Sequence, residues 1–226
     1  PGGTVTTETV EEAGAAVHLG YGTYSYTISK SGYRSIRGTL TIDQETAEEG
    51  LVISLTAEKS SEGAWDGLTK TEPQKSADGV YQIGTGAELA WLAGYVNQGN
   101  ATTSEPVKAA LTADIDLAGY DWTPIGTASN PFRGELDGQI HQIQNLYIDM
   151  ADASNVGLFG NISGYNVDGG CAVRNLTVAS GTVQVRQEDA RSLSNIGGIA
   201  GNASYTTFEN CINHANITVT VKSVLE

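Results

Sequence analysis

Apolar and polar residues alternate along much of the chain, in short runs that glycine, serine or asparagine separates. The runs over 22–28, 37–42 and 51–55 each place apolar or aromatic side chains at every second position. A period of two sends successive side chains to opposite faces of a strand, so each run predicts a short β-strand with one face toward a core. The pattern therefore predicts an all-β protein.

The first 60 residues hold several of these runs, with glycine and serine turns between them and no helical periodicity. Short alternating strands joined by tight turns are typical of an antiparallel sandwich. We therefore predict an Ig-like β-sandwich over 1–60. A first strand is lacking from this pattern, so we expect the chain to be a monomeric piece excised from a longer protein.

A polar stretch over 61–79 predicts a linker, in which Trp65 is expected to pack on a neighbouring domain. The next segment, 85–97, predicts a single amphipathic helix. Thr85 and Glu88 have the spacing of a capping box, and leucines and a valine follow at helical spacing. We expect this helix to cover the exposed apolar end of a repeat array over 80–226.

Three stretches of the predicted array resemble one another around an asparagine. They align, at spacings of 30 and then 35 residues, when the following residues are superposed: Asn145, Asn175 and Asn210. These spacings fall within the range of stacked repeats. Equivalent residues of parallel repeats lie above one another, so we expect the asparagines to form a hydrogen-bonded ladder at one corner. In the same alignment the residues expected to stack inside are Ile143, Val173 and Phe208.

A glycine tetrad also recurs in the array. Its first copy is Gly157-Leu158-Phe159-Gly160, and its second is Gly198-Ile199-Ala200-Gly201. Glycine permits either a positive φ or a close approach between backbones. Both tetrads are therefore predicted to be structural parts of the repeat.

Residues 107–117 predict one strand of the array, with Leu111 and Ile115 inside and Asp114 and Asp116 on the outer face. Together with Asp137, these carboxylates are the candidate chemistry of the chain. A carboxylate pair can supply a general acid and a base for glycan cleavage, or oxygen ligands for Ca²⁺. The alternative is a solvated strand face, with Asp137 in a simple turn.

Other reactive residues give weaker signals. The three histidines are too scattered for a metal site or a His-led triad. Cys171 and Cys211 are expected on different sides of neighbouring repeats, hence as buried free thiols rather than a disulfide. No cofactor is expected.

The charge balance excludes several partners. The formal net charge is −14, and no basic stripe is visible, so a nucleic-acid partner is not expected. An anionic membrane surface would repel the chain, and no apolar run is long enough to span a bilayer. We therefore expect no membrane insertion.

The motifs WLAGYVN, LTADIDLAGYDWTPIG, VGLFG, VRNLTV, IGGIAG and ENCIN together resemble the GLUG-repeat regions of large bacterial surface proteins, especially those of Gram-positive gut bacteria. The run GTYSYTISKSGYRSIRGTLTI resembles PEGA and carboxypeptidase-regulatory-like modules. The first resemblance implies a right-handed parallel β-helix in an extracellular or cell-surface protein. It implies no catalytic residue, because the repeat is not the catalytic part of family members that are peptidases.

Three functions follow from these observations. The first is a non-catalytic spacer, stalk or adhesive module that binds host protein or glycan if it binds anything. The second is a carbohydrate-active enzyme that uses the outer carboxylates. The third is an accessory region of an exported peptidase.

Overall fold

The computed structural model describes residues 20–28, 36–44, 63–187 and 195–221. The chain divides into two compact units, Pro1–Lys59 and Ser60–Glu226. Strands dominate the described residues, and one α-helix, α2 (Gly86–Asn97), is described among them. The predicted all-β class is thus confirmed. No helix in the described ranges is long and apolar enough to cross a membrane.

The first unit contributes one antiparallel strand pair to the description. β1 (Gly22–Ile28) pairs with β2 (Ile36–Ile42). Tyr24 and Tyr26 are half-buried while Thr23 is exposed, which confirms the alternation predicted for β1. The strand predicted over 51–55 lies outside the described residues, so the Ig-like sandwich stays a prediction.

The second unit holds the remaining described strands. They are β3 (Tyr81–Ile83), β4 (Val107–Leu111), β5 (Ile115–Asp116), β6 (Gly134–Asp137), β7 (Gln142–Gln144), β8 (Leu146–Ala151), β9 (Phe159–Ser163), β10 (Cys171–Arg174), β11 (Thr177–Val178), β12 (Gly181–Gln187), β13 (Ala200–Ser204), β14 (Thr206–Glu209), β15 (Ile212–Asn213) and β16 (Asn216–Val221). Every pairing between these strands is parallel.

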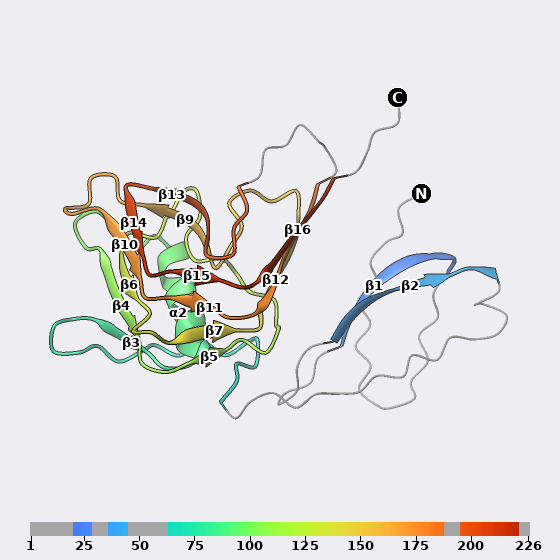
Figure 1. The fold of residues 1–226 in the computed structure, drawn as a ribbon, viewed down its shortest axis with the longest axis horizontal. Helices are drawn as coiled ribbons and strands as arrows, with labels where there is room; N and C mark the ends of the chain where they lie inside the picture. The colour runs from blue at the N-terminus through green and yellow to red at the C-terminus, as the bar shows by residue number, and fades with distance from the viewer. Residues whose placement is uncertain (1–19, 29–35, 45–62, 188–194, 222–226) are drawn as a thin grey trace. The chain divides into compact units, whose positions relative to one another are not determined.

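Successive strands of the chain join four parallel sheets in an order that repeats along the sequence (Figure 1). The sheet orders are β3-β4-β6-β10-β14, β5-β7-β11-β15, β8-β12-β16 and β9-β13. We call β4–β5 the first pass, β6–β9 the second, β10–β13 the third and β14–β16 the fourth. Each pass thus lays its strands beside the corresponding strands of the pass before it.

The register between passes differs from the one predicted. Ile143 pairs with Ile115 and Val178, whereas Val173 pairs with Leu136 and Phe208. The prediction that Ile143 shares a stack with Val173 is therefore wrong. The alignment had superposed the corner after β7 on the corner after β10, because both corners carry the same local asparagine signal.

Residues 107–117 form two strands, β4 and β5, and not the single strand that was predicted. β4 belongs to the five-stranded sheet and β5 to the four-stranded sheet, so the chain turns a corner between Leu111 and Ile115. The predicted sides hold, since Leu111 and Ile115 are buried and Asp114 is exposed. The alternation of apolar and polar residues continues through the corner, so the sequence pattern alone could not reveal where the chain turns.

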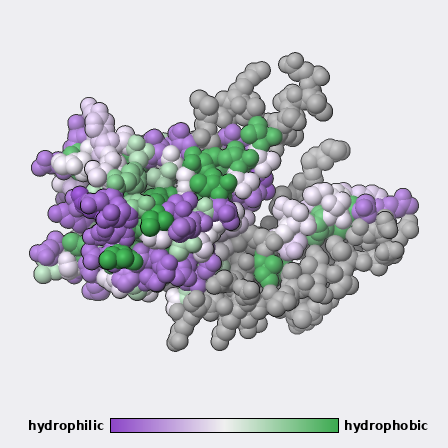
Figure 2. Space-filling model, in the orientation of Figure 1, coloured by the Kyte–Doolittle hydropathy of each residue, from purple (hydrophilic) through white to green (hydrophobic). Residues whose placement is uncertain are grey.

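The fourth pass is covered on one side only. Ile217 and Val219 of β16 are 45% and 47% exposed, whereas their partners in the third pass, Val183 and Val185, are fully buried. Figure 2 shows the resulting apolar patch over β16, on a surface that is otherwise mostly hydrophilic. Inward side chains therefore need a neighbouring pass on both sides to be fully buried.

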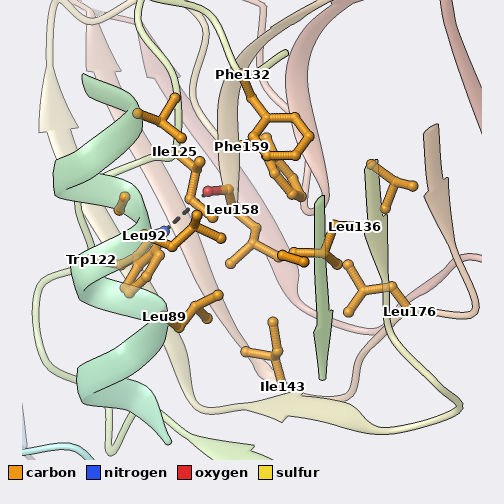
Figure 3. Close-up of a cluster of buried hydrophobic side chains, with 14 of the residues drawn as sticks. Leu89, Leu92, Trp122, Ile125, Phe132, Leu136, Ile143, Leu158, Phe159 and Leu176 are labelled. Atoms are coloured by element: carbon orange, nitrogen blue, oxygen red, sulfur yellow. Dashed lines mark hydrogen bonds between the residues drawn. The ribbon is translucent and has the colours of Figure 1, made fainter. Parts of the chain in front are cut away.

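Helix α2 has the predicted capping box. The Glu88 amide donates to Thr85 Oγ1 at 3.2 Å, and the Thr85 amide donates to Glu88 Oε2 at 3.0 Å. Its apolar face is buried, and Figure 3 shows Leu89 and Leu92 packed against Trp122 of the segment that follows the first pass. The predicted helix and its buried apolar face are thus confirmed, whereas its role as the cap of a β-helix stays a prediction.

Trp65 is also part of this unit. It is 7% exposed, and its ring contacts Trp122 at a centroid distance of 5.7 Å. Its amide donates to Asp116 O at 2.9 Å. Trp65 therefore packs within the second unit, and the linker boundaries at 61 and 79 stay a prediction.

The two tetrads lie side by side in neighbouring passes. Phe159 lies beside Ala200 in the β9–β13 pair. A Cβ on Gly160 would lie 2.5 Å from Gly126 O, and one on Gly201 would lie 2.3 Å from Val156 N. Neither glycine has a positive φ. Close approach between backbones, and not an unusual φ, is therefore why glycine occupies these positions.

Two glycine substitutions should change stability in opposite directions. Gly160→Ala forces a side chain into backbone and should lower the free energy of unfolding by about 3 kcal/mol. Gly94→Ala lies in α2, where the nearest atom to the new Cβ is Lys70 Nζ at 3.7 Å. It should raise stability by about 0.5–1 kcal/mol. Urea denaturation followed by tryptophan fluorescence measures both, and equal effects would contradict the close-approach account.

Candidate functional site

The second unit has a cleft of about 460 Å³ beside the first corner of the array. Its lining residues are Ser76, Val80, Gln82, Ala110, Leu111, Thr112, Gln139 and His141. They come from β3 and the segment before it, from the end of β4, and from the turn between β6 and β7. The lining therefore combines amide, hydroxyl and imidazole groups with a few apolar side chains, and the candidate carboxylates lie close by in the sequence.

A strained turn brings Gln139 and His141 to the cleft. The His141 amide donates to Gly138 O at 2.7 Å, and the two residues between them are left-handed, with φ of 51° at Gln139 and 68° at Ile140. This is the backbone of a type I′ turn, which normally uses asparagine and glycine. Ile140 is β-branched and 90% exposed, so packing does not offset its strain.

Asp114 holds the other side of this turn. Its Oδ1 lies 3.2 Å from His141 Nδ1 and accepts from the Gln142 amide at 3.1 Å. Its Oδ2 accepts from Gln142 Nε2 at 3.1 Å. The Gln142 side chain, then the Gln142 amide and His141, lower the pKa of Asp114 below its ordinary value. The carboxylate is therefore held as an anion, which suits an acceptor and not a proton donor.

Asp116 and Asp137 are both acceptors at corners of the array. Asp116 Oδ1 accepts from the Ala118 amide at 2.8 Å and from Asn145 Nδ2 at 2.7 Å. Asp137 Oδ1 accepts from the Gln139 amide at 2.8 Å and from Asn175 Nδ2 at 3.0 Å. Each carboxylate thus joins its own corner to the next pass.

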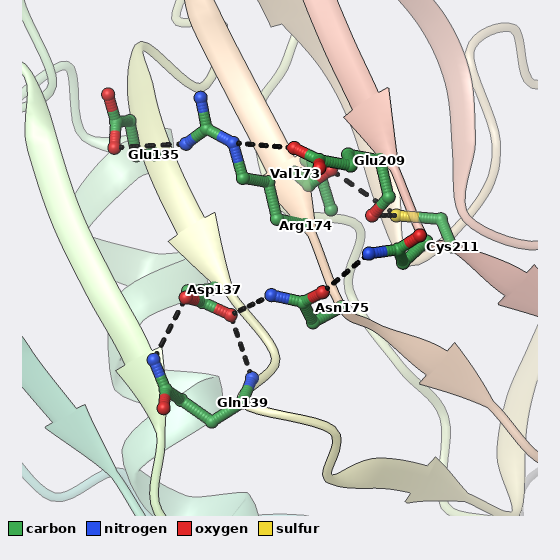
Figure 4. A network of polar contacts seen from close by, with 9 residues as sticks. Glu135, Asp137, Gln139, Val173, Arg174, Asn175, Glu209 and Cys211 are labelled. Atoms are coloured by element: carbon green, nitrogen blue, oxygen red, sulfur yellow. Dashed lines mark hydrogen bonds and ion pairs between the residues drawn. The ribbon is translucent and has the colours of Figure 1, made fainter.

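The asparagine ladder spans three passes (Figure 4). Asn210 Nδ2 donates to Asn175 Oδ1 at 3.0 Å, and Asn175 in turn donates to Asp137. Beside it runs an ion-pair ladder in which Arg174 lies 3.3 Å from Glu135 and 3.4 Å from Glu209.

Asn145 is not part of this ladder, so that part of the prediction is wrong. It bonds to Asp116, and its amide donates to Ser180 Oγ at 2.9 Å at a different corner. It resembles Asn175 and Asn210 in φ, which is 51–56° for the three residues, because each corner needs a left-handed residue.

Two further asparagine pairs bridge successive passes and were not predicted from the sequence. Asn202 Nδ2 donates to Asn161 Oδ1 at 2.8 Å, and Asn195 Nδ2 donates to Asn155 Oδ1 at 2.8 Å. Asn161 and Asn202 each follow a glycine tetrad directly. The recurrence of the tetrads at a spacing of 41 residues was therefore the signal that could have found this pair.

The structure offers little for a metal ion or a reactive thiol. Within the described ranges, no three His, Cys, Asp or Glu residues lie close enough together to hold a metal. Cys171 and Cys211 are both free thiols. Burial raises the pKa of Cys171, which disfavours the reactive thiolate.

Comparison with known proteins gives two relatives. The chain is 31% identical over 131 residues to a protein of Evansella cellulosilytica whose name describes it as a Gly-rich membrane protein; the match covers 58% of this chain and 14% of that protein. It is 28% identical over 218 residues to halomucin of Haloquadratum walsbyi, a match that covers 88% of this chain and 2% of halomucin. The chain thus spans only a small part of either relative. No family model and no solved structure matches.

The ladder can be separated from the left-handed backbone by substitution at Asn175. Asn175→Gly keeps the positive φ and removes the hydrogen bonds, so it should cost about 1–2 kcal/mol of stability. Asn175→Ala adds the strain of a left-handed alanine, about 1 kcal/mol more. Asn166→Gly is the matched control, because Asn166 is exposed with a φ of 59°. Equal losses of unfolding free energy in the two glycine variants would show that the ladder contributes nothing.

The lowered pKa of Asp114 predicts a pH dependence. A carboxylate whose pKa is lower folded than unfolded stabilises the fold above the unfolded pKa, near 4, and loses this contribution as pH falls through the folded value. The stability difference between the wild type and Asp114→Asn should therefore shrink below about pH 4. In Gln142→Ala, NMR titration should find the pKa of Asp114 closer to its ordinary value. An unchanged pKa would contradict the assigned cause.

Proposed function

We propose that the chain is a non-catalytic module of a bacterial cell-surface or secreted protein. In this proposal residues 80–226 form a right-handed parallel β-helix with GLUG-type repeats that serves as a spacer, and residues 1–60 form an Ig-like module. Parallel sheets that the chain visits in a fixed order support the β-helix. The relatives, one named as a membrane protein and the other as halomucin, fit a location at or outside the cell surface.

One observation carries the proposal. The polar side chains that the sequence analysis predicted as a candidate site form hydrogen bonds within a pass or between passes. Asp116 accepts from Asn145, and Asp137 accepts from Asn175. A spacer built of stacked passes needs residues that hold successive passes together, and residues used in this way are not free for catalysis.

The geometry of such a module suits a spacer. Each additional pass adds one strand to each sheet, and neighbouring strands lie about 4.8 Å apart. The length of the array therefore grows with the number of passes while its cross-section stays constant. A protein that must display another domain far from the cell gains distance in this way without a new fold.

A carbohydrate-active enzyme is less well supported. Glycan cleavage by two carboxylates needs one of them to act as an acid, with a raised pKa. The pKa of Asp114 is instead lowered, and Asp116 and Asp137 both accept backbone amides as well as asparagine side chains. All three carboxylates are thus engaged as hydrogen-bond acceptors within the array.

An activity screen tests the proposal against the enzyme alternative. The full chain is incubated with pectate, alginate, xylan and chitin, and new reducing ends and unsaturated products are measured. We expect no turnover above a protein-free blank. Asp116→Asn and Asp137→Asn should lower the unfolding free energy, whereas Asp78→Asn, an exposed aspartate, should not. Turnover that disappears in Asp116→Asn or Asp137→Asn but persists in Asp78→Asn would overturn the proposal.

Location is tested separately. Antibodies raised against the chain should label intact cells of the producing organism, or its culture medium. Labelling only after the cells are lysed would contradict a surface or secreted module.

A further inference from the structure

Two exposed tyrosines from successive passes lie against one another. Tyr165 lies in the connection between β9 and β10, and Tyr205 between β13 and β14, at one corner of the second unit (Figure 1). Their ring centroids are 5.6 Å apart, and the ring planes are tilted by 57°. The residues are 56% and 70% exposed. Neither ring is buried in the core.

The backbone beneath the pair is fixed. Gly164 donates to Ser204 O at 2.9 Å, and Cys171 donates to Tyr205 O at 3.0 Å. A Cβ on Gly164 would lie 2.1 Å from Tyr205 O, so the two connections are in close contact. The rings therefore project into solvent from a rigid base.

A side chain of the preceding segment holds the other connection. The Arg133 guanidinium donates to Ser163 O at 2.9 Å and to Tyr165 O at 3.1 Å. These two carbonyls flank Gly164, so Arg133 clamps the chain directly under the first ring. Positioning of this kind reduces the entropy that a ligand must remove on binding.

Tyr205 is strained, and nothing in the core offsets the strain. Its φ is 50°, in the left-handed region that asparagine occupies at the corners of Asn175 and Asn210. A bulky residue there costs about 1–2 kcal/mol, and a ring that is largely exposed recovers little of it by packing. The corner explains the left-handed φ but not the choice of tyrosine over asparagine, and this choice motivates a functional hypothesis.

We propose that Tyr165 and Tyr205 form a binding site for a neutral oligosaccharide. Tyrosine rings offer an apolar face that stacks on the C–H face of a sugar, and a hydroxyl that bonds to sugar hydroxyls. The net charge of −14 disfavours acidic glycans and nucleic acids.

The inference rests on the proposed function in one respect, because a glycan reaches this pair only on a protein displayed outside the cell. The two can still fail separately. Binding is measured on the purified full chain, whereas location is measured on cells. Absence of binding with surface labelling intact would overturn the inference alone.

The test uses a printed array of neutral oligosaccharides, with sialylated and sulfated ones for comparison, followed by NMR titration of the strongest binder. We expect the full chain to retain neutral glycans. Tyr165→Ala and Tyr205→Ala should each weaken binding by about tenfold. Tyr21→Ala, which removes an exposed tyrosine of the first unit, should leave it unchanged.

Tyr205→Asn separates binding from folding. Asparagine suits the left-handed φ, so this variant should be at least as stable as the wild type in urea and yet lose glycan binding. The inference is overturned if no neutral glycan is retained by the array. It is equally overturned if Tyr205→Asn binds as tightly as the wild type.

Discussion

Parallel pairing between successive passes is the constraint on which the second unit depends. It places each residue beside the residue at the same position of the next pass, so the same chemistry must recur at each position. Leu136, Val173 and Phe208 follow one another inside, and Phe159 and Ala200 follow one another at the tetrads. A single pass has too few residues to bury its own apolar side chains. Each pass therefore owes its stability to the neighbours that cover it.

The polar ladders obey the same constraint and have a direction. An asparagine side chain can donate to one neighbour and accept from another, whereas an ionised aspartate can only accept. Asn210 donates to Asn175, which donates to Asp137, so the aspartate ends the ladder on the side of the earlier pass. Asp116 plays the same part toward Asn145. Asp116 and Asp137, two of the three carboxylates that suggested catalysis, are thus terminal acceptors of structural hydrogen bonds, and this role explains why they lie at corners.

Local signals were predictable from sequence, and the offset between passes was not. The capping box of Thr85 and Glu88 involves residues three apart, so the prediction of α2 needed no knowledge of the fold. Asn145 and Asn175 carry the same corner signal, however, and only the lengths of the intervening connections distinguish their corners. The approach of Asp114 to His141 follows from the pairing of β5 with β7. It could not be foreseen while that register was misplaced.

The first and the last described passes differ in how they are covered. Leu89 and Leu92 of α2 are fully buried against the early part of the array. In the fourth pass, Phe208 is 42% exposed at a position where Val173 of the third pass is fully buried. The difference in exposure shows how much burial an inward side chain gains when a second neighbouring pass covers it. Because burial drives folding in proportion to the apolar area removed from water, local stability should decline from α2 toward β16. The tyrosine pair joins the connection that leads into the third pass to the one that leads into the fourth, and the strained residue, Tyr205, lies in the second of these connections.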